Sequence, residues 1–277
     1  MTYSKIILAI PHSASMSYED FLEWKHTDGA FKDMVRWTDW STDEIFEPDN
    51  STSTISKLVF PLSRFTVDVE RLYDDPLASV GRGFIYTTSH SGSTRIISKK
   101  RYNELFQKWA SYRRSLVSRI TDNSLIIDCH SFPEDIDPSV DINIGYNIGD
   151  WSRPDQEVII QVCDYFKSRG FSVGLNHPYS NSIVPSYYPI RKYHSIMIEV
   201  NKGLYMQSPD DAAFNWCSQK IYQHYNSSSP SHFVYNKEHL VYDECLKELL
   251  NKTIKRQEVE SLNVVMNDLY TKLLKRS

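Results

Sequence analysis

Short runs of apolar residues recur along the chain, and few of them alternate with polar residues. Continuous apolar runs of this length are typical of strands in a sheet that helices cover on both faces. The segments with this pattern predict strands at 5–10, 55–60, 65–69, 83–88, 124–129, 171–175 and 195–200.

Segments with helical spacing lie between these runs. Residues 100–120 repeat large apolar side chains three or four positions apart, which predicts one buried helix face. Residues 154–169 begin with a proline suited to a first helical turn and end before Gly170, a residue that favours helix ends. Because strands and helices alternate, we predict an α/β fold with a mixed, mostly parallel central sheet and helices on both faces.

The end of the chain has a different pattern. After the serine-rich segment 225–233, residues 236–253 and 258–276 both have the pattern of helices. We therefore expect residues 1–225 to form the main domain and residues 226–277 to form a helical extension that packs on the same domain.

Composition and charge exclude several classes of function. The 277 residues are 40% hydrophobic and 24% charged, as in folded globular proteins. A net charge of −4 and a pI near 6.1 provide no basic surface for nucleic acid, and no segment approaches the length of a membrane span. The cysteines are far apart and form no CxxC motif, which together with the missing signal segment favours a cytoplasmic protein with reduced thiols.

Polar side chains stand at or near the ends of three predicted strands. His12 follows the first, Asp128 and His130 stand at the end of the fifth, and Glu199 interrupts the apolar run of the last. In an open α/β sheet, ligands bind outside the carboxyl ends of the strands. Two histidines and a carboxylate are the ingredients of a catalytic zinc site, and a further carboxylate can act as base on water.

Each of these residues also has a structural interpretation. A single histidine after a strand is commonly a loop residue with one hydrogen bond, and Glu199 could instead pair with an arginine. The chain has no HExxH motif and no neighbouring pair of histidines that would define a metal site locally. From the residues alone, a zinc site and a structural role both stay open.

Seven motifs, in order, resemble the N-formylglutamate amidohydrolase family. They are IPHSASMSY (10–18), WTDWSTDEIF (37–46), SRFTVDVERLYDDP (63–76), IIDCHSFP (126–133), DINIGYNIGD (141–150), GFSVGLNHPYSNSIVPSYY (170–188) and IMIEVNKGLYM (196–206). The resemblance implies a phosphorylase/hydrolase-like fold similar to that of the zinc carboxypeptidases. It also implies an amidohydrolase that cleaves an N-acyl amino acid, with N-formyl-L-glutamate, giving formate and glutamate, as the first expectation.

The resemblance further implies roles for single residues. His12, Asp39 and His130 would bind Zn²⁺, with Asp43 as the alternative to Asp39, and Glu199 would be the general base. The residues expected to bind substrate are Arg71, Arg64, Asn176 and Tyr179. The carboxylates expected to orient the ligand histidines are Asp68 and Asp128.

Several positions depart from the family pattern. Glu70 replaces the asparagine before the substrate-binding arginine, Ala14 replaces a glycine, Lys202 replaces an arginine, and Arg113 replaces a histidine. A carboxylate at position 70 should weaken the binding of an acidic substrate. Two alternatives therefore stay open. The first is a metallo-carboxypeptidase or amidase acting on a short peptide or cell-wall amide, and the second is a non-enzymatic binding protein with a vestigial site.

Overall fold

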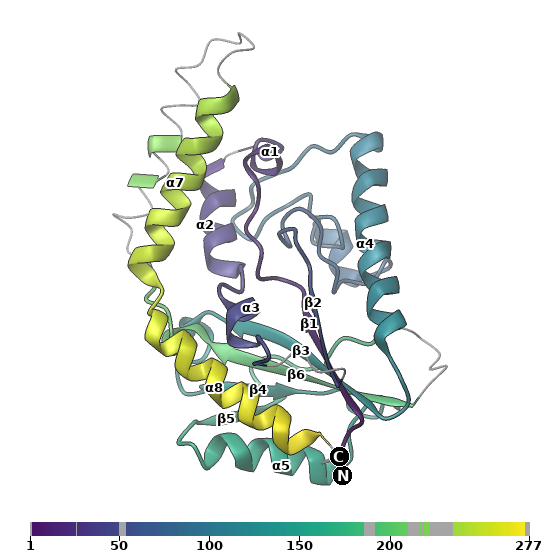
Figure 1. Ribbon diagram of the computed structural model, residues 1–277. Helices are drawn as coiled ribbons and strands as arrows, with labels where there is room; N and C mark the ends of the chain where they lie inside the picture. The colour runs from purple at the N-terminus through teal and green to yellow at the C-terminus, as the bar shows by residue number, and fades with distance from the viewer. Residues whose placement is uncertain are drawn as a thin grey trace.

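A six-stranded sheet forms the centre of the computed structural model, with strand order β2-β1-β3-β6-β4-β5 (Figure 1). The structure describes residues 2–25, 27–49, 54–185, 192–209, 216–217, 219–221 and 235–274. The strands are β1 (Lys5–Ile10), β2 (Ile55–Val59), β3 (Ser124–Phe132), β4 (Ile142–Gly145), β5 (Val173–Leu175) and β6 (Tyr193–Asn201). Strands β2, β1, β3 and β6 are mutually parallel, and β4 is antiparallel to β6, which confirms the predicted mixed, mostly parallel sheet.

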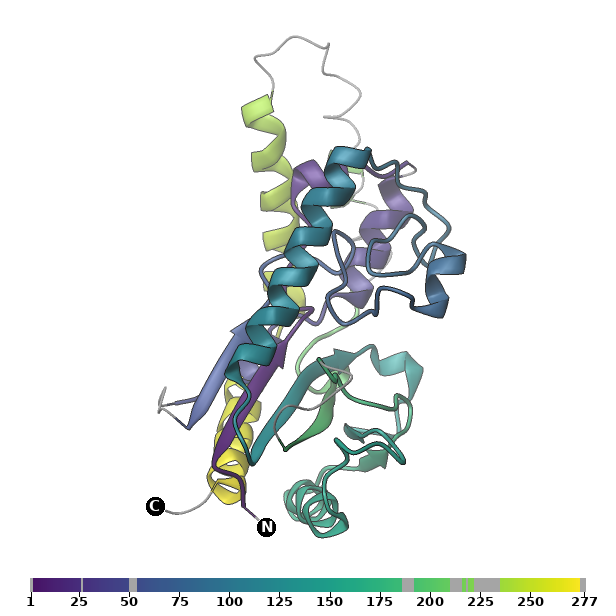
Figure 2. The same cartoon turned by 90° about the vertical axis from the view of Figure 1, so that its right-hand side faces the viewer.

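Helices cover both faces of this sheet, as predicted. The helices and helical turns are α1 (Tyr18–Phe21), α2 (Thr27–Trp37), α3 (Thr42–Ile45), η1 (Pro76–Val80), α4 (Lys99–Arg119), η2 (Glu134–Ile136), α5 (Gln156–Lys167), η3 (Lys202–Leu204), α7 (Tyr235–Thr253) and α8 (Arg256–Leu273). The core around Leu125 and Ile127 of β3 includes buried side chains of α2, α5, α7 and α8. The opposite core, around Ile126, includes those of α4, which Figure 2 shows on the other side of β1 from α8.

The side chains of the central strand β3 point alternately into these two cores. Successive side chains of a strand point to opposite faces. Ile127 and Cys129 therefore lie in the core with α8, whereas Ile126 lies in the core with α4. By the same alternation, Asp128 and His130 share the face of α4, and this face carries the candidate site.

Two predicted strands, 65–69 and 83–88, are wrong. These segments form turns and bends, with isolated bridges of Arg82 to Tyr86 and of Thr88 to Thr94. The Asp68 amide donates to the Phe84 carbonyl oxygen at 2.7 Å. Their apolar side chains, including Val67 and Phe84, are buried against the sheet and α4. The apolar pattern was correct about burial, but these segments cover the sheet without joining it. Strand β4, which no strand prediction covered, is only four residues long.

The C-terminal helices pack on the main domain. The Tyr3 amide donates to the Leu273 carbonyl oxygen at 2.8 Å, and Asn263 of α8 donates to backbone carbonyl groups at the end of α3. The proposed boundary between residues 225 and 226 lies outside the described residues and stays a prediction. Within the described ranges, no helix is long and apolar enough to cross a membrane.

Candidate metal centre and active site

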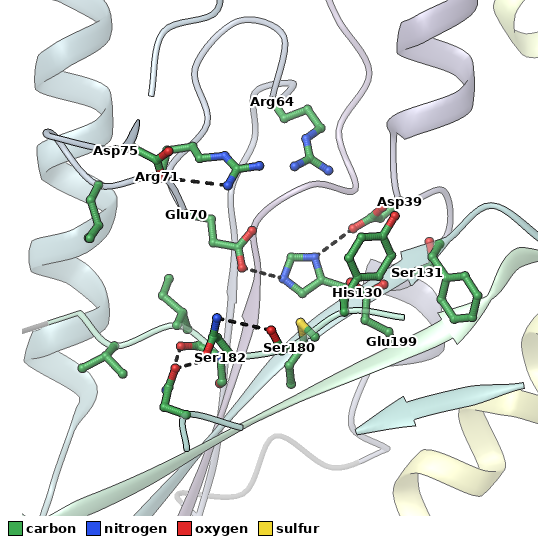
Figure 3. A pocket seen from close by; sticks show the side chains of 18 of the residues that line it. Asp39, Arg64, Glu70, Arg71, Asp75, His130, Ser131, Ser180, Ser182 and Glu199 are labelled. Atoms are coloured by element: carbon green, nitrogen blue, oxygen red, sulfur yellow. Dashed lines mark hydrogen bonds and ion pairs between the residues drawn. The ribbon is translucent and has the colours of Figure 1, made fainter. Parts of the chain in front are cut away.

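A cavity of about 750 Å³ opens beside the carboxyl ends of β3 and β6 (Figure 3). Polar and charged side chains from distant segments line it. Its carboxylates are Asp39, Glu70, Asp75, Asp150 and Glu199, its arginines are Arg64, Arg71, Arg82 and Arg113, and its histidines are His90 and His130. Such a concave surface with convergent titratable groups is the expected form of a small-molecule site.

The structure brings His12, Asp39 and His130 together. The imidazole rings of His12 and His130 lie 5.1 Å apart between centroids. The Asp39 Oδ2 atom is 3.0 Å from His130 Nδ1 and 3.8 Å from His12 Nδ1. The Asp39 amide donates to the His12 carbonyl oxygen at 3.0 Å, which fixes the loop after α2 beside the end of β1. Possible donor atoms of the three residues all lie within 4.8 Å of one another. Asp43 belongs to no such group among the described residues.

A second carboxylate lies on the other side of each imidazole. His12 Nε2 is 2.9 Å from Asp68 Oδ1, and His130 Nε2 is 3.1 Å from Asp128 Oδ1. When Nε2 carries the hydrogen and donates it to these carboxylates, the Nδ1 lone pairs face Asp39. This arrangement of carboxylate, histidine and open lone pair is how proteins orient the histidine ligands of a metal.

The donor set fits a zinc ion. His12 Nδ1 is buried and has no hydrogen-bond partner among the described residues. A buried polar atom left without a partner costs roughly 1–3 kcal/mol, which a bound cation would relieve. Burial raises the pKa of Asp39, but the imidazoles of His12 and His130 beside it outweigh burial and hold that pKa well below its usual range. An ionised carboxylate with two imidazole nitrogens is a ligand set that zinc accepts.

Glu199 lies next to this group in the sheet. It pairs with His130 across β3 and β6, is 7% exposed, and has a buried Oε2 atom with no hydrogen-bond partner among the described residues. Burial, together with the negative charges of Asp39 and Glu70, raises its pKa to about 8. A carboxyl group in a cavity with a pKa raised toward neutrality is a candidate general base and acid.

The residues expected to contact substrate fall into two sets. Arg64, Arg71 and Tyr179 line the cavity. Asn176 is not among its lining residues, since its Oδ1 atom accepts the Tyr146 amide at 2.8 Å and stabilises a turn. Its role in substrate binding therefore stays a prediction that the lining of the cavity does not support.

Several lining residues had no predicted role. Arg82, Asp150 and Trp151 come from segments that local spacing does not connect to the site. His90 also lines the cavity and stacks on Trp37 with ring centroids 4.6 Å apart. Glu70, noted only as a departure from the family, lies with Oε1 3.3 Å from His130 Nε2. Glu70 carried a signal in the sequence, because it departs from the family pattern, as does Arg113, which also lines the cavity.

Comparisons with known proteins agree with the motifs. The crystal structure of N-formylglutamate amidohydrolase from Ralstonia eutropha JMP134 has a TM-score of 0.65 and 13% identity, covering 99% of this chain and 95% of that chain. A gene product of Agrobacterium tumefaciens has a TM-score of 0.50 and 15% identity, covering 73% of this chain and 81% of that chain. At such identities the likeness concerns the fold, and no curated protein matches. The model of the N-formylglutamate amidohydrolase family matches residues 4–206, so this protein belongs to that family of hydrolases, as its motifs predict.

Proposed function

We propose that this protein is a zinc-dependent amidohydrolase that cleaves the amide of an N-acyl amino acid. The leading substrate is N-formyl-L-glutamate, with formate and glutamate as products. The observation that carries this proposal is the buried group of His12, Asp39 and His130, whose possible donor atoms lie within 4.8 Å of one another. Membership in the family supports amide hydrolysis.

His12, Asp39 and His130 would hold the zinc ion, which when bound lowers the pKa of water toward neutrality and polarises a carbonyl group. Glu199 would accept the proton of the attacking water, because its Oε2 atom has no other partner among the described residues. The same carboxyl group would then donate that proton to the leaving nitrogen. Its burial against β3 would keep it in place for both transfers.

Arg64 and Arg71 are suited to hold a substrate carboxylate, because a guanidinium group can bind a carboxylate through two parallel hydrogen bonds. Both line the cavity, and Figure 3 shows both above the ring of His130. Tyr179 would contribute to the wall of the same pocket. The volume of about 750 Å³ lies within the range of sites that hold small organic ligands.

Glu70 favours a second candidate function. Its side chain lines the cavity directly before Arg71 in the chain, and Arg71 already faces Asp68 at 3.7 Å and Asp75 at 3.8 Å. The negative charges of these carboxylates would reduce the attraction of Arg71 for an acidic substrate. A metallo-carboxypeptidase or amidase acting on a short peptide or cell-wall amide is therefore the alternative.

The test is an assay of purified protein with and without zinc. Formate release from N-formyl-L-glutamate that requires zinc would support the leading substrate. Zinc-dependent cleavage of peptides or other N-acyl amino acids without formate release would select the alternative. Absence of zinc binding and of hydrolysis on every substrate would contradict both enzyme functions. Asp39→Asn should weaken zinc binding, and Asp43→Asn is its matched control, since Asp43 lies outside the group of donor atoms.

A further inference from the structure

Glu70 lies on the side of the two imidazoles opposite to Asp39. Its Oε1 atom is 3.3 Å from His130 Nε2, and its Oε2 atom is 3.9 Å from His12 Nε2. Figure 3 shows Glu70 and Asp39 on opposite sides of the His130 ring. We propose that Glu70 is a positioning residue that holds His130 in the orientation required for metal binding, an inference that rests on the proposed zinc site.

The surroundings of the two histidines differ. His12 Nε2 has one hydrogen-bonded carboxylate, Asp68 at 2.9 Å. His130 Nε2 has one hydrogen-bonded carboxylate, Asp128 at 3.1 Å, and a second carboxylate, Glu70, at an ion-pair distance of 3.3 Å. The second oxygen of Asp128 accepts the Ile183 amide at 2.8 Å. Glu70 is thus an additional acceptor for an imidazole that already has a fixed one.

The backbone of Glu70 is fixed by the same carboxylate that orients His12. The Glu70 amide donates to Asp68 Oδ1 at 3.1 Å. Asp68 is fully buried and also accepts from Arg64 at 3.3 Å and from the Tyr86 hydroxyl at 3.1 Å. A continuous path of contacts therefore runs from His12 through Asp68 and Glu70 to His130. This path fixes both imidazoles relative to each other from the side away from Asp39.

A carboxylate acceptor strengthens the hydrogen bond from a ligand histidine and raises the basicity of the nitrogen that binds metal. The asparagine that the family pattern has at this position would offer only a neutral amide. The side chain of Glu70 is 27% exposed, so it reaches His130 from the wall of the cavity without being enclosed. Its contribution should therefore appear in metal affinity, independently of any substrate.

The experiment measures the zinc dissociation constant by competition with a chelator. Glu70→Gln keeps the size of the side chain and removes the charge, and we expect zinc affinity to fall by about 10- to 100-fold, as for other groups that orient metal ligands. The absorption spectrum of the Co²⁺-substituted protein should shift as well. Asp75→Asn is the matched control, because Asp75 lines the same cavity and faces Arg71 at 3.8 Å. Its zinc affinity should equal that of the wild type.

Two results would overturn this inference and leave the proposed function intact. The first is tight zinc binding by the wild type with the same affinity in Glu70→Gln, and the second is a loss of zinc affinity in Asp75→Asn equal to that in Glu70→Gln. Failure of the wild type to bind zinc would overturn the proposed function and the inference together. Should Glu70→Gln not fold, Glu70→Asp keeps the charge and withdraws it from His130. A lower zinc affinity in that variant is expected, and an unchanged affinity would again count against the positioning role.

Discussion

Glu199→Gln should make the enzyme less active and the metal-free protein more stable. The substitution keeps the size of the side chain and removes a carboxyl group whose Oε2 atom has no hydrogen-bond partner among the described residues. Loss of a general acid and base costs typically about 10²- to 10⁴-fold in rate, which corresponds to roughly 3–5 kcal/mol of transition-state stabilisation. Turnover of the best substrate should fall by that factor at saturating zinc.

The effect on stability follows from the raised pKa of Glu199. Burial raises this pKa from 4.5 to about 8, so between these values the folded chain keeps a proton that the unfolded chain releases. Stability therefore falls as pH rises through this window. Between pH 4.5 and 7 the loss is about 3 kcal/mol, at roughly 1.4 kcal/mol per pH unit, as an upper value. The neutral glutamine removes this loss, so the variant should gain up to that amount at pH 7 and little near pH 4.

Urea unfolding of both proteins in the presence of a chelator, at pH 4 and pH 7, measures this difference. Glu260→Gln on the exposed side of α8 is the control, and its stability should stay close to that of the wild type at both pH values. A Glu199→Gln variant that is less stable than the wild type at pH 7, or equally stabilised at both pH values, would refute the account of Glu199 as a buried carboxyl whose Oε2 atom has no partner in the described part of the chain. Full activity in the variant would refute its role as the base.

Three further predictions concern the metal and the substrate. His12→Ala and His130→Ala should each abolish stoichiometric zinc binding, measured by metal analysis after dialysis, and a variant with full zinc content would contradict the ligand assignment. Burial lowers the pKa of His130, but the neighbouring carboxylates outweigh it and raise that pKa well above 6.5, so zinc must displace a proton and its affinity should rise with pH. Calorimetry in buffers of different ionisation enthalpy counts the released protons, and a count of zero would contradict this. Arg71→Ala should raise KM for N-acyl amino acids more than it lowers kcat, and unchanged KM across a substrate panel would remove Arg71 from substrate binding.

Much of the fold follows from apolar patterning. Strand β1 and helix α4 have the bounds that the runs predict to within a residue, because a buried strand and a one-sided helix both require a particular apolar spacing. The same patterning failed at 65–69 and 83–88, where apolar side chains are buried by turns that cover the sheet. The apolar pattern reports that a segment is buried. Whether the segment also pairs as a strand depends on where a partner strand lies.

The candidate site was predictable in its residue types and only partly in its geometry. His12 and His130 stand at or near the ends of parallel strands, and parallel neighbours bring such positions to one edge of a sheet. Asp39 comes from the loop after α2, and only the family motif indicated it. The position of Glu70 against His130 depends on the turn that Asp68 forms with the Glu70 amide, which no local spacing predicts.

Anomalous diffraction at the zinc absorption edge, from crystals of the zinc-loaded protein, tests the central claim most directly. We predict one peak per chain at about 2.0–2.2 Å from the Nδ1 atoms of His12 and His130 and from a carboxylate oxygen of Asp39. A zinc-loaded protein whose peak lies away from both imidazoles would contradict the proposed site and the chemistry built on it.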